Sequence, residues 1–98
     1  MMNDTVATVA IKRAILSTIN SLYALAIDSV DVLNIRIEYS SKMKLMNIQL
    51  FRKNTTHKAY NLVLLDSEDA LKELLLIEDQ IIEMVSELRD EIEVGALV

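Results

Sequence analysis

Hydrophobic positions recur every three or four residues in the first part of the chain, a spacing typical of one face of an α-helix. The pattern predicts a helix over residues 5–28. Its apolar face consists of Ile11, Ile15, Ile19, Leu22 and Ala26. Asn3, Asp4 or Thr5 can cap the amino end, because a short polar side chain can accept a hydrogen bond from a free backbone N–H group there.

The spacing then changes to an alternation of apolar and polar residues, which indicates β-strands with one covered face. Three such runs are predicted as strands, at residues 32–39, 44–52 and 58–65. The side chains expected to face inward are Leu33, Ile35, Ile37 and Tyr39, then Met46, Ile48 and Leu50, then Tyr60, Leu62 and Leu64; those expected on the opposite face include Leu45, Phe51 and Val63. Short polar segments separate the runs, so we expect an antiparallel meander.

Helical spacing returns over residues 67–92. Its apolar row is Ala70, Leu74, Ile77, Ile81, Met84 and Leu88. Asp66 is the expected cap, with Asp69 three residues later in a relation like that of a capping box, and residues 93–98 are expected to form a short tail. The predicted fold class is therefore α+β in the order α-β-β-β-α. Two helices are expected to pack on one face of the three-stranded antiparallel meander, with residues 1–98 forming a single domain.

Composition narrows the class of protein. Hydrophobic residues make up 52% and charged residues 26% of the chain, which is too apolar for a disordered protein and too charged for a membrane protein. The most apolar stretch, residues 14–27, is interrupted by serine, threonine and asparagine, so it is not expected to span a membrane. Cysteine is absent, which excludes disulfides and thiolate ligands or nucleophiles. We expect a cytoplasmic protein with no membrane partner.

Charge is divided sharply between two segments of the chain. Residues 66–93 contain eleven acids and two bases, a net charge of −9, whereas residues 36–58 contain six bases and one acid, a net charge of +5. The acidic face of the last helix comprises Asp69, Glu73, Asp79, Glu83, Glu87, Asp90 and Glu91. The basic patch around the strands comprises Lys42, Lys44, Arg52, Lys53 and Lys58.

The acids repeat like charge along the helix. Asp79, Glu83 and Glu87 stand four residues apart, a spacing at which like charges repel by about 0.2–0.5 kcal/mol per pair. Acids near the carboxyl end also oppose the helix dipole. A charged helix face is most often only a solvated surface, but an arrangement that costs stability is also typical of a surface that attracts a basic partner.

A second apolar set lies beside the core row of the last helix. It consists of Leu71, Leu75 and Ile82 at spacings of four and seven, and we call it the flank. A flank on a helix that already carries a full apolar row indicates either a broad core or a contact between two copies of the chain. The predicted use is dimer contact.

Catalytic and metal-binding patterns are missing. His57 is the only histidine, lies in a polar loop and has no companion ligand at a metal-site spacing. The helical carboxylates project from one exposed face, where they share one environment and do not converge on a cation. We expect no enzyme activity, no cofactor and no metal.

These observations favour a small non-enzymatic regulator or inhibitor that presents its acidic helix face to a basic protein surface, of the kind that ordinarily binds nucleic acid. Small acidic inhibitors of the phage and immunity type are similar in size and charge, although no motif supports more than that analogy. One alternative is an assembly module that forms a helix-mediated homodimer. Another is a weak nucleic-acid binder that uses the basic patch, which the net charge of −5 disfavours.

Overall fold

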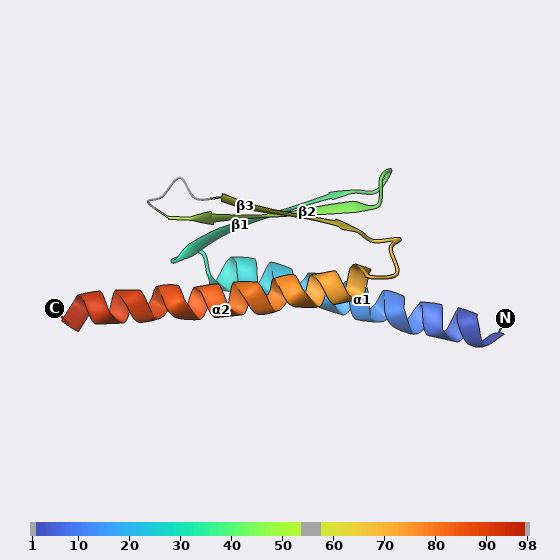
Figure 1. The fold of residues 1–98 in the computed structure, drawn as a ribbon, viewed down its shortest axis with the longest axis horizontal. Coiled ribbons are helices and arrows are strands. Elements are labelled where there is room, and N and C mark those ends of the chain that lie inside the picture. Colours follow the sequence, from blue (N-terminus) through green and yellow to red (C-terminus); the bar gives the residue numbers. More distant parts are fainter. Residues whose placement is uncertain (1, 54–57, 98) are drawn as a thin grey trace.

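Two helices cover one face of a three-stranded antiparallel sheet, and the other face of the sheet is bare (Figure 1). The structure is a computed structural model that describes residues 2–53 and 58–97. The elements are α1 (Met2–Asp28), β1 (Leu33–Ser40), β2 (Leu45–Arg52), β3 (Lys58–Leu64) and α2 (Ala70–Leu97). The predicted α+β class and the α-β-β-β-α order are therefore confirmed.

The strand register decides which side chains face the helices. Ile48 in the middle strand pairs with Ile37 of β1 and with Asn61 of β3. Because side chains alternate between faces, every second residue from these three positions belongs to the same face of the sheet. The inner row of β3 therefore consists of Ala59, Asn61 and Val63, and its outer row consists of Tyr60, Leu62 and Leu64.

The prediction for β3 is wrong by one position. Tyr60, Leu62 and Leu64 were expected to face inward, yet their side chains are 59%, 63% and 56% exposed. Val63, which was expected on the opposite face, is only 1% exposed. Both rows of β3 are largely apolar, so alternation alone does not distinguish them, and the pairing with β2 decides the face.

The core is a single apolar layer between the sheet and the helices, to which all five elements contribute. Fully buried members are Leu22 of α1, Leu33 of β1, Ile48 of β2 and Leu74 and Ile81 of α2, each 0% exposed. The apolar rows predicted for β1, β2 and α2 supply most of the remaining core side chains. Tyr39 belongs to the inner row of β1 but is 51% exposed, because it lies at the end of the strand beside a groove under α1.

The helices run in the same direction but are staggered along their axes (Figure 1). The first part of α1 extends beyond one end of the sheet, and the last part of α2 extends beyond the other. This stagger gives the molecule extents of 62 × 23 × 18 Å. Ile11, predicted for the core-facing row of α1, is 50% exposed and is not among the core residues.

Both predicted helix starts are wrong by three residues. Helix α1 begins at Met2, so Asn3, Asp4 and Thr5 lie within its first turn and not before it. The predicted start at residue 67 of the last helix moves to Ala70. The predicted tail at 93–98 is also wrong, because α2 continues as a helix to Leu97.

The residues before α2 form a turn of their own. The Ser67 hydroxyl accepts a hydrogen bond from the Asp69 N–H at 3.2 Å, and the Asp69 carbonyl accepts the first helical bond from the Glu73 N–H at 2.8 Å. Asp69 therefore occupies the cap position that was predicted for Asp66. The Asp66 carboxylate instead lies 3.3 Å from the Lys44 ammonium group.

The turn between β1 and β2 lacks a glycine and uses Lys44 in its place. Lys44 has a φ of 52°, in the left-handed region that lysine seldom adopts. Its carbonyl accepts a hydrogen bond from the Leu65 N–H at 2.8 Å, and its side chain is paired with Asp66. These two contacts hold the turn against the segment that leaves β3. The predicted β2–β3 loop, with Asn54, Thr55, Thr56 and His57, lies outside the described residues.

The corrected orientation of β3 can be tested with two threonine substitutions. Val63→Thr places a hydroxyl in the apolar layer without changing the side-chain shape, and we expect it to lower the free energy of unfolding by about 1–3 kcal/mol. Leu62→Thr, its neighbour on the bare face, should change it by less than about 0.5 kcal/mol. Urea unfolding followed by circular dichroism measures both. A larger loss for Leu62→Thr than for Val63→Thr would contradict the register.

Candidate functional site

The acidic face lies on the parts of α2 that do not touch the core. All seven of its carboxylate side chains are exposed: Asp69, Glu73, Asp79, Glu83, Glu87, Asp90 and Glu91. At 100° per residue they form two adjoining rows. Asp79, Glu83 and Asp90 form one row, in which Glu83 lines a groove with Arg52 of β2 and Asp90 lines a groove with Asp28 of α1. The other four lie along the side of the helix that borders β3, where Glu73 lines a groove with Tyr60 and Leu62.

Arg52 of β2 lines a groove with Glu83 and Glu87, so one internal cation lies beside this face. In the described part of the chain the ion pairs include Arg36–Glu38 at 2.7 Å, Lys44–Asp66 at 3.3 Å and Arg89–Asp31 at 3.3 Å. None of the seven carboxylates of the acidic face takes part in them. Their negative potential therefore extends into solvent, reduced by dissolved salt and, near Glu83 and Glu87, by the charge of Arg52.

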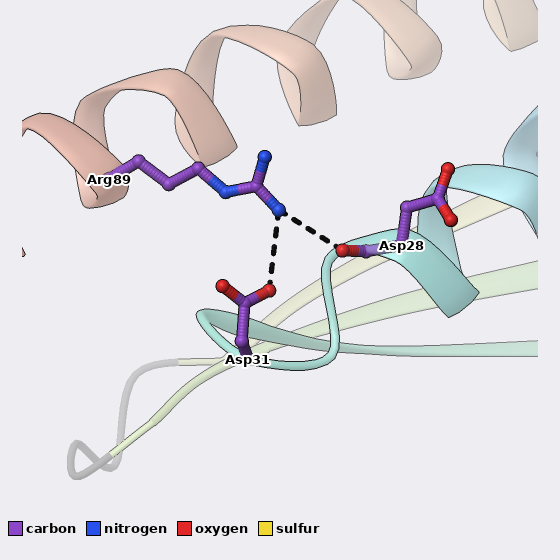
Figure 2. Close-up of polar contacts among 3 residues, drawn as sticks. All are labelled: Asp28, Asp31 and Arg89. Atoms are coloured by element: carbon purple, nitrogen blue, oxygen red, sulfur yellow. Dashed lines mark hydrogen bonds and ion pairs between the residues drawn. The ribbon is translucent and has the colours of Figure 1, made fainter.

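Arg89 is one of the two cations in the acidic segment, and its side chain is directed toward Asp28 and Asp31 (Figure 2). Its guanidinium donates a hydrogen bond to the Asp28 carbonyl at 3.1 Å and lies 3.3 Å from the Asp31 carboxylate. Asp28 is the last residue of α1, so its carbonyl has no partner within the helix, and a cation there also favours the helix dipole. Arg89 thus joins α2 to the turn between α1 and β1.

The length of α2 changes the electrostatic cost of its acids. The helix continues to Leu97, so its last turn comes after Asp90, Glu91 and Glu93. Because the dipole effect is strongest in the last turn, it repels these three acids less than predicted. Repulsion between Asp79, Glu83 and Glu87 remains, because these residues are exposed and four positions apart within the helix.

The predicted basic patch is divided in two by the length of β2. Lys42 and Lys44 lie in the turn before the strand, whereas Arg52, Lys53 and Lys58 lie at its far end. Eight residues of extended chain separate the two groups by about 25 Å. The Lys58 ammonium group lies 5.7 Å from the centre of the Phe51 ring, a cation–π contact within the sheet. The structure therefore does not bring these five side chains together on one surface.

The flank lies on the side of α2 that borders α1. Leu71 is half-buried, while Leu75 and Ile82 are 44% and 49% exposed. Ile82 shares a groove with Leu25 of α1. The flank is thus partly used within the chain, and about half of its surface remains open to solvent, as a dimer contact requires.

Two features were missed by the sequence prediction. One is the role of Arg89, which depends on a partner 58 residues away and has no local signal. The other is the exposed outer row of β3. A comparison of side-chain sizes along this strand does not reveal it, because the larger residues are the exposed ones.

Metal-binding clusters are absent from the residues that the structure describes: no three histidine, aspartate or glutamate side chains are placed to hold a cation. His57 lies outside those residues. Within the same part of the chain, neither helix has a stretch that is apolar enough to cross a membrane.

Comparisons of the chain with protein families, with curated proteins and with solved structures find no match.

Reversing one charge in the centre of the acidic face should stabilise the protein. Glu83→Lys converts two repulsive pairs, with Asp79 and Glu87, into attractive pairs, and we expect a gain of about 1 kcal/mol in the free energy of unfolding. Glu83→Gln removes the repulsion alone and should give about half of that gain. Urea unfolding at low and high salt measures both variants. A loss of stability in either variant at low salt would show that the carboxylates are not in mutual repulsion.

The contact made by Arg89 should contribute little stability of its own. Its side chain is 51% exposed and that of Asp31 is 61% exposed, so solvent screens the pair. In a double-mutant cycle with Arg89→Ala and Asp31→Ala we expect a coupling free energy below about 1 kcal/mol. A coupling well above that value would mean that the pair behaves as a buried one.

Proposed function

We propose that this protein is a non-enzymatic regulator or inhibitor that binds another protein through the acidic face of α2. The observation that carries the proposal is that all seven carboxylates are exposed and lie outside the Arg36–Glu38, Lys44–Asp66 and Arg89–Asp31 ion pairs, while Arg52 of β2 is the one basic side chain that shares a groove with two of them, Glu83 and Glu87, among the described grooves. The partner accordingly presents a basic surface, of the kind that ordinarily binds nucleic acid. Long-range attraction would speed the encounter, and the close contact would bring cations to the acids.

The arrangement of the acids supports this proposal over a face kept only for solubility. A solubilising helix can alternate acids with lysines four residues apart and gain stability from each pair. Helix α2 instead repeats like charges at that spacing. The cost is offset when a cationic partner binds, which gives a physical reason for the repeats.

The test is quantitative capture from a lysate of the source organism, with the tagged protein as bait and mass spectrometry as the readout. The triple variant Glu83→Lys, Glu87→Lys, Asp90→Lys should lose at least about tenfold of the specific capture at low salt, equivalent to about 1.4 kcal/mol. Its matched control keeps the charge and changes only side-chain length: Glu83→Asp, Glu87→Asp, Asp90→Glu. The control should capture the same partner as the wild type.

Salt provides a second readout of the same surface. The Debye length falls from about 10 Å at 0.1 M to about 3 Å at 1 M, so capture by the wild type should weaken as salt is raised. Unchanged capture by the triple reversal at low salt would contradict the proposal.

A second candidate function is assembly through the helices, favoured by the half-exposed flank. Leu75→Asp or Ile82→Asp should then abolish self-association, whereas the triple charge reversal should not. Sedimentation equilibrium at micromolar concentration measures the mass directly. A strictly monomeric wild type would remove this candidate.

A further inference from the structure

Strand β3 directs its smaller side chains toward the core and exposes its larger ones. Ala59 and Val63 face the core, together with the polar Asn61, while Tyr60, Leu62 and Leu64 are each more than half exposed on the bare face of the sheet. Full burial of one leucine stabilises a protein by about 1.5–3 kcal/mol. A strand that served only this chain's core would place its larger residues inward. The outer row of β3 is therefore better suited to contact with another molecule.

The apolar surface of β3 extends onto β2 only at the two ends of that strand, at Leu45 and Phe51. Leu64 pairs with Leu45, and Lys58 pairs with Phe51, in the register of the two strands. The Phe51 ring meets the Tyr60 ring edge to face, with 6.5 Å between their centres. The bare face of β1 is different, because it carries Asn34, Arg36 and Glu38. Among the described residues, the outer row of β3 is thus the most apolar part of the bare face, although Asn47 and Gln49 of β2 lie opposite Leu62 and Tyr60.

Strand β3 also forms an unprotected edge of the sheet. The strand order is β1-β2-β3, so β1 and β3 are the two edges, and each leaves one row of backbone N–H and C=O groups without a strand partner. Edges are commonly protected by charged residues or proline. The β1 edge has the Arg36–Glu38 ion pair near its middle. Between Ala59 and Leu64, β3 has neither a charge nor a proline.

Helix α2 lies beside this edge and adds carboxylates to it. A groove of about 400 Å³ runs between β3 and α2 and is lined by Tyr60, Leu62, Glu73, Leu76 and Gln80, among others. Leu76 is 57% exposed. Glu73 and Glu87 lie along the same side of α2, since 14 residues are about four helical turns, and Asp69, just before the helix, is one turn from Glu73. The β3 edge is thus bordered by the apolar outer row of β3 on the bare face of the sheet and by carboxylates of α2 on the helix side.

We infer that the β3 edge accepts an extended segment of a basic partner as a fourth strand. The backbone of the segment would pair with β3, and its side chains would alternate between the two faces of the extended sheet. Apolar residues would cover Tyr60, Leu62 and Leu64, and the residues between them, lysine or arginine, would meet Glu73 and its neighbours on α2. That the partner is basic rests on the proposed function. That it pairs as a strand rests on the unpaired edge and the exposed apolar row of β3.

Charge disfavours a second copy of this chain as the occupant. If β3 paired with β3 of another copy, the acidic sides of the two α2 helices would approach each other across the new junction. Glu73 of each copy would then oppose like charges, which costs free energy. The groove therefore fits a cationic segment of a different protein.

The probe is a fluorescent peptide of about the length of β3, in which lysine alternates with leucine or valine. We expect it to bind with a dissociation constant in the micromolar range, measured by anisotropy. Its control has the same side chains and charge but carries N-methyl groups on alternate residues, which removes the backbone donors needed for strand pairing. Loss of several hydrogen bonds, each worth about 1 kcal/mol, should weaken binding by at least about tenfold.

Two variants of the protein locate the binding edge. Leu62→Lys places a charge in the outer row of β3 and should weaken binding of the parent peptide by about tenfold or more. Asn34→Lys is the matched control, because it adds the same charge to an exposed position on the bare face of the other edge strand. This variant should bind like the wild type. Circular dichroism confirms that both remain folded.

The outcomes separate this inference from the proposed function. Strand pairing is overturned if the parent and N-methylated peptides bind equally well. If that binding is also lost in the triple reversal of Glu83, Glu87 and Asp90, the acidic-face proposal stands. Binding that survives the triple reversal but is lost with N-methylation or with Leu62→Lys supports strand pairing and overturns the acidic-face proposal. A wild-type dimer that Leu62→Lys dissociates overturns the choice of a basic partner. Failure of the parent peptide to bind overturns the inference as a whole.

Discussion

The apolar layer between one sheet face and two helices is the interaction on which the rest of this molecule depends. Leu22, Leu33, Ile48, Leu74 and Ile81 come from four different elements and are all fully buried in it. Since no described helix or strand covers the far side of the sheet, the strand side chains that do not face the helices are directed to the bare face. The same layer sets the rotation of α2 and so directs its carboxylates outward. The positions of the acidic face of α2 and of the outer row of β3 both follow from which side chains pack into this layer.

Much of this arrangement could be predicted where the two faces of an element differ in polarity. On β1 the alternation of isoleucine with asparagine, arginine and glutamate determines the inward face, and the structure agrees. On α2 the apolar row and the acidic face are separated by helical spacing, so the exposure of the carboxylates was also predictable. On β3 both rows are largely apolar, and the face depends on pairing with β2, which local alternation does not encode.

The remaining differences have similar causes. The start of α2 depends on a competition between Asp66 and Asp69 for the cap position, and the Ser67 hydroxyl decides it by forming a turn with the Asp69 N–H. The division of the basic patch depends on which end of β2 each lysine or arginine occupies, which a count of charges along the sequence does not consider. The role of Arg89 depends on the packing of two helices that are distant in sequence.

The staggered helices have a consequence for hydrodynamic measurements. A compact domain of about this length has a radius of gyration near 13 Å, whereas this chain has 16.0 Å. A particle 62 Å long and about a third as wide experiences more friction than a sphere of equal mass, so it diffuses more slowly and elutes early from a gel-filtration column. An apparent mass taken from elution volume would therefore exceed the true mass of a monomer, and early elution alone would not distinguish a dimer from a single elongated chain.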